Sequence, residues 1–174
     1  IRPPSEAESL FIRVTRNCPW NKCLFCPAYK GKKFSRRTVA EIKEDILAMK
    51  GALDKVKTYA LRMGEGLNIS RKTLEIIYQR EPGLLQVAFW LYRGGKNVFL
   101  QDADSLVMPA EQLAEVLTFI REQLPTVERI TTYARSKTVC RRSVSDLEKV
   151  REAGLDRVHI GLETGHDPLL EFMC

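Results

Sequence analysis

The chain has 174 residues, 44% of them hydrophobic and 29% charged, a composition typical of one folded domain with a sizeable core. Its formal net charge of +6 permits an anionic partner such as a nucleotide or nucleic acid, but a solvated basic surface would give the same value. The longest apolar stretch, Leu84 to Tyr92, falls well short of the roughly 18 residues of a membrane span, so no membrane-spanning helix is expected.

Predicted strands and helices alternate along the chain, beginning near the N-terminus. Residues 10–15 (LFIRVT) alternate partly between the two faces of an extended segment, which predicts a strand, and a cysteine-rich loop follows. Thr38 and Glu41 then have the spacing of a capping box. The apolar residues behind them recur at helical spacing and predict a helix that ends at Gly51.

The alternation is interrupted over residues 52–96. Within this stretch, residues 70–80 and 82–92 are predicted to be helical. We therefore expect a helical insertion between the first helix and the second strand. It could serve as a cap near the site or as an elaborated connection.

Three further strands are predicted in the second half, and each is followed by a helix. The predicted strands are 97–101, 127–133 and 155–162, and the helices open at Pro109, at Ser143, and at His166 or Asp167. Because four strands alternate with helices, the sequence predicts an α/β fold with a parallel sheet. Right-handed crossovers would curl that sheet into an open or closed barrel.

The ends of the sequence give two expectations. The last predicted helix is only about two turns long at Cys174 and has no C-cap signal, so we expect further strands beyond it. The first residues include Pro3 and Pro4 and do not resemble a signal peptide, which favours the cytoplasm. The sequence starts at Ile1 rather than Met, so a leader could precede it.

The chain has five cysteines, and three of them lie within nine residues. Cys18, Cys23 and Cys26 form this group, whereas Cys140 and Cys174 stand apart. A disulfide framework would spread its cysteines more evenly. The clustering therefore indicates a metal site in a reducing compartment.

The three clustered cysteines form a C-x4-C-x2-C loop after the first predicted strand, where βα barrels place their active sites. Closely spaced thiolates suit soft metals and iron–sulfur clusters. A structural zinc site needs four ligands, whereas a cluster with three cysteines leaves one iron open. Zinc and redox-active cysteines remain alternatives, and His159 or His166 could be a distant fourth ligand or a structural residue.

With Phe25 before its last cysteine, this loop resembles that of the radical S-adenosylmethionine (radical SAM) superfamily. The resemblance covers residues 9–174 and implies a partial TIM-like (βα)6 barrel, of which residues 1–174 hold about four units as the N-terminal part of the core. The strand ends resemble the branch with the Elongator catalytic subunit, methylthiotransferases and oxygen-independent coproporphyrinogen oxidases. The commonest family loop is C-x3-C-x2-C, so the first gap here is one residue longer.

The resemblance implies an enzyme in which Cys18, Cys23 and Cys26 bind three irons of a [4Fe–4S] cluster. S-adenosylmethionine would chelate the fourth iron through its amino and carboxylate groups. An electron from a donor such as flavodoxin or ferredoxin would then allow cleavage to methionine and a 5′-deoxyadenosyl radical. That radical would abstract hydrogen from a substrate that the sequence does not identify.

The resemblance also implies residues that hold S-adenosylmethionine. Phe25 would pack beside the adenine. Asp102 first, and Asp104 second, would receive the ammonium where the family usually has a Gly-Gly-Glu-like segment; either could instead cap the following loop. Arg135 could bind the carboxylate or form a surface ion pair. Glu163, in a Gly-x-Glu-Thr-Gly segment, would face the ribose or the methionine moiety.

A basic run follows the cysteine loop. It could meet RNA, a nucleotide or an acidic protein, or it could simply be a solvated face. It leaves two other functions open, a zinc-stabilised RNA-binding module and a non-catalytic iron–sulfur electron carrier. The run consists of Lys30, Lys32, Lys33, Arg36 and Arg37.

Overall fold

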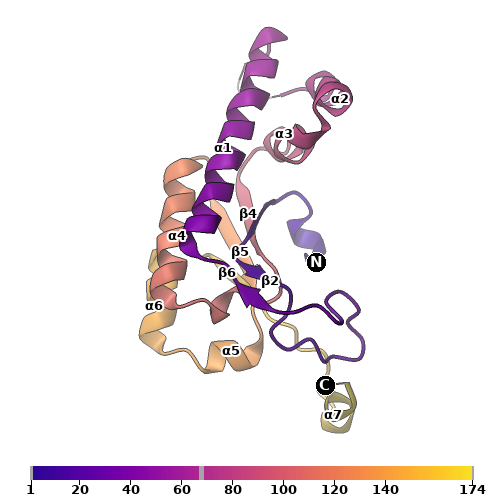
Figure 1. Cartoon of the computed structure of the whole chain (residues 1–174), viewed down its shortest axis with the longest axis vertical. Coiled ribbons are helices and arrows are strands. Elements are labelled where there is room, and N and C mark those ends of the chain that lie inside the picture. The colour runs from indigo at the N-terminus through magenta and orange to yellow at the C-terminus, as the bar shows by residue number, and fades with distance from the viewer. Residues whose placement is uncertain (1, 67–68, 174) are drawn as a thin grey trace.

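Four parallel strands form the centre of the molecule. The structure is a computed structural model that describes residues 2–66 and 69–173. The strands lie in the order β1-β4-β5-β6, and each neighbouring pair is parallel (Figure 1). The α/β fold with a parallel sheet is therefore confirmed, and it is consistent with a partial TIM-like barrel. The strands are β1 (Leu10–Arg13), β4 (Asn97–Gln101), β5 (Arg129–Tyr133) and β6 (Arg157–His159).

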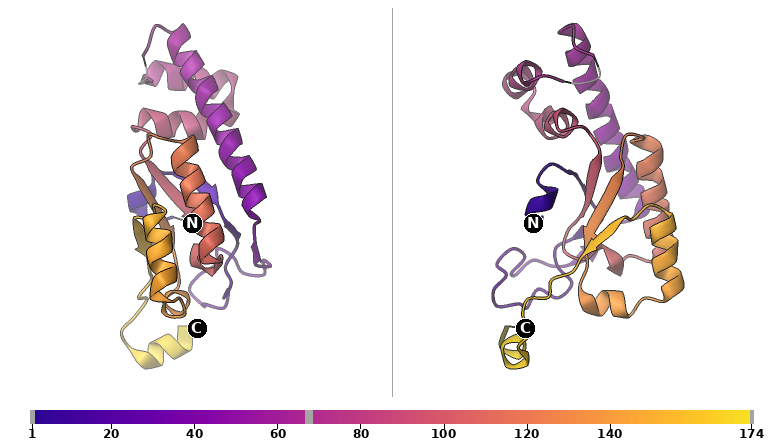
Figure 2. Two further views of the ribbon diagram at one scale, coloured as in Figure 1. Left: turned by 90° about the vertical axis from the view of Figure 1, so that its left-hand side faces the viewer. Right: turned by 180° about the vertical axis from the view of Figure 1, so that it is seen from behind.

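Helices α1, α4 and α6 cover one face of this sheet, as Figure 2 shows. None of the described helices is long and apolar enough to cross a membrane. The helices are α1 (Val39–Arg62), α2 (Arg71–Arg80), α3 (Leu85–Tyr92), α4 (Ala110–Gln123), α5 (Ser136–Cys140), α6 (Val144–Glu152) and α7 (Asp167–Met173). Three short 3-10 turns are η1 (Pro4–Glu6), η2 (Pro82–Leu84) and η3 (Ser105–Val107).

The core lies between the sheet and the helices. Leu10 and Ile12 of β1 are almost completely buried, whereas the intervening Phe11 and the final Arg13 are more exposed. This alternation follows from the pleat of a strand, which sends successive side chains to opposite faces. Ile42 and Ile46 of α1 are likewise buried in this core.

The first helix is longer than predicted. We expected it to end at Gly51, but α1 continues to Arg62 and Gly51 lies within it, so residues 52–62 are not part of an insertion. The physical reason is that Leu53, Val56 and Ala60 continue the buried stripe, and their burial outweighs the roughly 1 kcal/mol cost of a helical glycine. The two following helices, α2 and α3, form as predicted.

Three other element boundaries differ from prediction. The segment 10–15 divides, because Thr15–Arg16 (β2) leaves the main sheet and pairs antiparallel with Ser35–Arg36 (β3). The predicted strand 155–162 is shorter and ends at His159, and the strand predicted from 127 begins at Arg129. Helix α5 was not predicted, since five residues carry too little periodicity to be recognised.

Aromatic side chains cross the sheet on the face opposite the helices. The rings of Phe11 and Phe99 are 6.4 Å apart at nearly right angles, and those of Phe99 and Tyr133 are 5.2 Å apart. His159 of β6 continues the row, 5.9 Å from Tyr133. The row thus joins β1, β4, β5 and β6 through edge-to-face contacts.

The N-terminal segment packs on this aromatic face through a buried carboxylate. Glu6 is fully buried and accepts a hydrogen bond of 2.6 Å from the Ser9 hydroxyl. It also lies 3.3 Å from Arg129 of β5 and 3.3 Å from Nε2 of His159. A buried carboxylate needs such partners, and these contacts fasten residues 4–9 to the sheet.

Helix α1 begins at a complete capping box, which generates a stability prediction. The Thr38 hydroxyl accepts from the Glu41 amide at 3.2 Å, and the Glu41 carboxylate accepts from the Thr38 amide at 2.8 Å. Thr38→Ala should lower the free energy of unfolding by about 1 kcal/mol, because one amide loses its acceptor. Urea denaturation measures this, and Thr38→Ser should retain most of the stability. Equal losses in both variants would contradict the role of the cap.

Candidate functional site

The three clustered cysteines lie on a loop that begins at the carboxyl end of β1. The β2–β3 hairpin closes this loop, with Thr15 paired to Arg36. Asn17 and Asn21 adopt left-handed backbone conformations, with φ of 65° and 51°, which asparagine tolerates better than most residues. Their side-chain amides donate to the carbonyls of Lys33 and Lys32, at 2.7 and 3.2 Å. Together these bonds hold the two sides of the loop together.

The cysteine side chains are half-buried on this loop. The Asn21 amide lies 3.5 Å from Cys18 Sγ, and the Cys26 amide donates to the Cys23 carbonyl at 3.3 Å. Within residues 2–66 and 69–173, no three side chains of His, Cys, Asp and Glu are grouped as ligands of one metal ion. The loop therefore supplies three soft sulfur ligands without closing them around a single ion.

Tyr29 is the buried polar group that best tests whether the loop fits a cluster. Among the described residues its hydroxyl has no hydrogen-bond partner. Burial, and then the charge of Asp102, raise the pKa of Tyr29 above its ordinary value, and the thiols of Cys18 and Cys26 act in the same direction. A hydroxyl donor near these thiols fits a sulfur-rich anionic group, because hydrogen bonds to sulfur stabilise such clusters. Nothing in the sequence pattern had singled out Tyr29.

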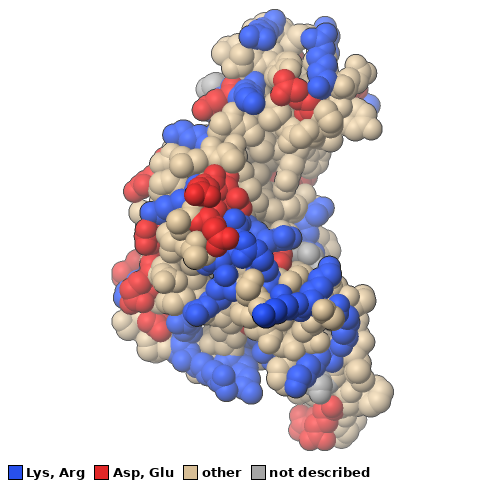
Figure 3. All heavy atoms as spheres, in the orientation of Figure 1, with Lys and Arg blue, Asp and Glu red and all other residues tan. Residues whose placement is uncertain are grey.

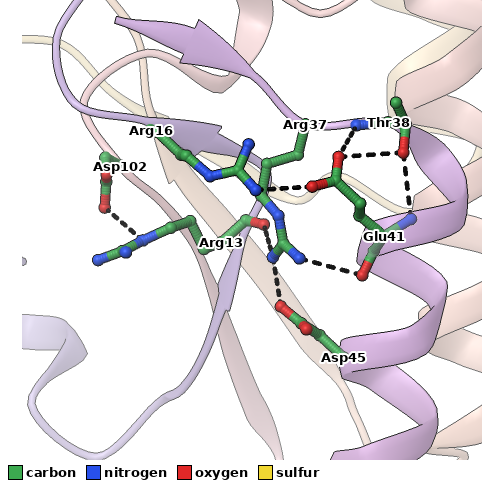
Figure 4. A network of polar contacts seen from close by, with 7 residues as sticks. All are labelled: Arg13, Arg16, Arg37, Thr38, Glu41, Asp45 and Asp102. Carbon is green, nitrogen blue, oxygen red and sulfur yellow. Dashed lines mark hydrogen bonds and ion pairs between the residues drawn. The ribbon is translucent and has the colours of Figure 1, made fainter. Parts of the chain in front are cut away.

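Asp102 connects the end of β4 to the start of the cysteine loop. Its side chain is nearly fully buried, and Oδ2 accepts from the Asn17 amide at 2.7 Å. Oδ1 lies 3.2 Å from Nε of Arg13 on β1 (Figure 4). The Asp102 amide itself donates to the Thr15 hydroxyl at 3.1 Å. The carboxylate thus holds the backbone immediately before Cys18.

Sequence reasoning missed Arg13, although a signal for it existed. Alternation along β1 places Arg13 on the same face as Phe11, opposite the buried Leu10 and Ile12. A basic side chain at this position can meet an acidic side chain at the end of the neighbouring strand, and Arg13 is paired in register with Gln101, next to Asp102.

The N-terminus of α1 is joined to the hairpin by ion pairs (Figure 4). Arg16 of β2 donates to Glu41 at 2.6 Å. The bond from the Thr38 amide and the pairing with Arg16 lower the pKa of Glu41 to about 2. Because the folded pKa lies below its ordinary value, this interaction stabilises the fold above that ordinary value and is lost as the pH falls toward 2.

Arg37 makes a second set of contacts in the same network. Its guanidinium donates to the Arg13 carbonyl at 3.0 Å and to the Glu41 carbonyl at 3.1 Å, and it pairs with Asp45. The hydrogen bond to Asp45 raises the pKa of Arg37 above its ordinary value. The end of β1 and the first turns of α1 are therefore fastened together directly beneath the cysteine loop.

Arg135 lies against the cysteine loop through Trp20. Its guanidinium carbon is 4.7 Å from the centre of the Trp20 ring, and Lys22 Nζ lies 5.1 Å from the same ring. Trp20 Nε1 is buried and has no hydrogen-bond partner among the described residues. The loop is thus joined to the segment after β5 by a cation–π contact.

Asp104 occupies a buried position beside α5. Its side chain is fully buried and accepts a hydrogen bond from the Thr138 hydroxyl. Burial raises the pKa of Asp104, and the neighbouring Arg135 and Arg142 act against this effect. These contacts are those of a residue that fixes the segment between β5 and α5.

Phe25 and Glu163 are both exposed. Phe25 lies on the cysteine loop with about half of its surface exposed. Glu163 follows β6 with a left-handed φ of 60°, and its carboxylate folds over Gly161, where a Cβ would meet Oε1 at 2.1 Å. Among the described residues, no hydrogen bond or ion pair joins Glu163 to the cysteine loop. The structure therefore brings Asp102 and Arg135 into contact with the loop.

Comparison with known proteins identifies one match. The family model described as "Radical SAM superfamily" matches residues 12–174, which is nearly the whole chain. No curated protein matches the chain, and no solved structure matches it. The matched region includes the end of β1, the cysteine loop and every later strand of the sheet.

The contacts of Asp102 predict a specific effect on the loop. In Asp102→Ala the Asn17 amide loses its acceptor, and leaving such a group unpaired costs roughly 1–3 kcal/mol. We therefore expect hydrogen exchange across residues 14–20 to accelerate by about tenfold or more, measured by mass spectrometry. Glu75→Ala is the matched control, since it removes an exposed carboxylate paired with Arg71 on α2, away from the loop. Unchanged exchange in Asp102→Ala would show that the carboxylate does not hold the loop.

Proposed function

Since the chain belongs to the radical SAM superfamily and is therefore an enzyme of this class, we propose that Cys18, Cys23 and Cys26 bind a [4Fe–4S] cluster with one iron open to S-adenosylmethionine. The observation that carries the proposal is the loop itself, which presents three thiols and follows β1 at its carboxyl end. When bound, the cluster supplies the electron that cleaves the sulfonium and yields a 5′-deoxyadenosyl radical.

In this proposal, residues around the loop hold the cysteines in place. Asp102 holds the Asn17 amide, and Arg13 pairs with its other oxygen. Each carboxylate oxygen can accept a further hydrogen bond, so Asp102 can also receive the ammonium of S-adenosylmethionine. Removing Asp102 would then disturb both the loop and the ligand, rather than the ligand alone.

Further residues can contact S-adenosylmethionine in this proposal. Phe25 is exposed on the loop and can lie beside the adenine. Glu163 is exposed after β6 and can face the ribose or methionine. Arg135 can reach the carboxylate only by sharing its guanidinium with Trp20. Asp104 is engaged by Thr138 of α5, which favours a structural role over binding of the ammonium.

The reaction needs a one-electron donor, and we propose a flavodoxin or ferredoxin. Clustered cysteines that must stay reduced to bind iron fit a cytoplasmic location.

The cluster proposal is tested by replacing one thiol. Cys23→Ala should abolish cluster binding during anaerobic reconstitution while leaving a folded protein, because the loop loses one of three iron ligands. Iron and sulfide content and the visible spectrum measure this. Cys140→Ala is the matched control, since Cys140 is exposed on α5 outside the loop.

Three outcomes would redirect the assignment. A colourless protein that binds zinc would favour a zinc-stabilised module, and full iron content in Cys23→Ala would reject the ligand set. A cluster that forms but never cleaves S-adenosylmethionine under dithionite would favour an electron carrier.

The role of Glu163 is tested separately by ligand affinity. Glu163→Gln should raise the Kd for S-adenosylmethionine by about tenfold, since the loss of one charged hydrogen bond costs about 1.4 kcal/mol. Anaerobic calorimetry on the reconstituted protein measures the affinity. Glu152→Gln, an exposed change on α6, should leave it unaltered. An unchanged Kd in Glu163→Gln would remove this residue from the site.

A further inference from the structure

Positive charge is distributed unevenly along the chain. Residues 9–40 and 133–145 together contain 12 of the 28 Lys and Arg residues and none of the 22 Asp and Glu residues. The first segment carries the cysteine loop, and the second follows β5 and includes α5. The basic excess of the protein is therefore carried by two segments near the candidate site.

The two segments meet in the folded molecule. Arg135 of the second segment stacks on Trp20 of the first, 4.7 Å from its ring centre. In Figure 3 Lys and Arg side chains gather over this part of the surface, around the cysteine loop and toward α5. We call this surface the loop face. Its members are Lys22, Lys30, Lys32, Lys33, Arg36, Lys137 and Arg141.

The charges of the loop face are not neutralised. All seven side chains belong to exposed residues, and none of them forms an ion pair within residues 2–66 and 69–173. On the helices behind the sheet, by contrast, two lysines have acidic partners: Lys43 pairs with Glu115 at 2.6 Å, and Lys149 pairs with Glu111. An uncompensated group of cations attracts an acidic surface and accelerates its association.

Part of the loop face is bonded to the cysteine segment. The carbonyls of Lys32 and Lys33 accept from Asn21 and Asn17, which stand on either side of Cys18. Lys32 and Lys33 therefore lie on the part of the loop that is hydrogen-bonded to the cysteine segment. A partner held by these lysines would lie close to the thiols.

The surface favours a protein over a nucleic acid as the partner. The Trp20 ring already has Lys22 and Arg135 against it and is half-buried, so it is not free to stack on a base. On the same loop Leu24 exposes 61% of its surface. An apolar contact within a charged rim is the usual composition of a protein–protein interface.

We propose that the loop face is the docking surface for an acidic one-electron carrier protein. This inference rests on the proposed function, because it places the carrier where the cluster would accept the electron. The carrier loses one electron and the cluster gains one, and no atom is transferred. Charge complementarity, rather than shape, would bring the two proteins together, so the association weakens as salt rises.

The test compares charge reversals on and off the loop face. An acidic flavodoxin serves as the probe, and its binding to the reconstituted protein is measured by calorimetry at low salt. Lys32→Glu/Lys33→Glu and Lys137→Glu/Arg141→Glu should each raise its Kd at least about tenfold. Lys55→Glu/Arg80→Glu makes the same change of charge on α1 and α2, and should alter the Kd less than about twofold.

A second measurement separates docking from the chemistry. Cleavage of S-adenosylmethionine driven by reduced flavodoxin should slow in the two loop-face variants, whereas cleavage driven by dithionite should not. Failure of the wild-type protein to cleave with dithionite would reject the proposed function, and flavodoxin binding would still report on the docking surface.

Three results would overturn the docking proposal. The first is a wild-type protein that does not bind flavodoxin, and the second is equal affinity in the loop-face and control variants. The third is a loop-face variant that no longer binds a single-stranded RNA oligonucleotide but binds flavodoxin as the wild-type protein does. That result would assign the surface to nucleic acid.

Discussion

The buried carboxylate of Asp102 is the interaction on which the arrangement of the site depends. It lies at the end of β4, yet it holds the backbone of Asn17 and pairs with Arg13 of β1. Because the desolvated carboxylate requires both partners, the cysteine loop is tied to two central strands. The ion pairs of Arg16 and Arg37 with α1 add a third attachment. These contacts fix the start of the 18-residue loop between β2 and β3 and thereby help to position its thiols.

The longer gap between the first two cysteines contains Trp20, which attaches the loop to another part of the chain. Trp20 is one of the four residues in that gap, and its ring meets Arg135 beyond β5. The gap therefore makes a contact across the end of the sheet. This contact joins the two basic segments, in which Lys32, Lys33, Lys137 and Arg141 have no acidic partners in the described parts of the chain. The same stacking that orders the loop thus helps to assemble the loop face.

The two faces of the sheet serve packing, and the carboxyl end of the strands carries the candidate site. One face of the sheet packs against α1, α4 and α6 through an apolar core (Figure 2). The opposite face carries the aromatic row and receives the N-terminal segment through Glu6. The cysteine loop and the segments after β4, β5 and β6 lie at the carboxyl end, where side chains are not needed for the core. That division allows polar residues to gather there without weakening the fold.

The sequence alone determined the α/β class, the four parallel strands, the capping box at Thr38 and the family, because local periodicity and a short motif encode them. It also singled out the three cysteines and the acidic and basic residues that end the strands. It could not determine that α1 passes through Gly51, that α5 exists, or that Trp20 and Tyr29 lie at the candidate site. Only the tertiary structure decided these points, since burial of a helix stripe and contacts such as Asn17 with Asp102, 85 residues apart, depend on how distant segments pack.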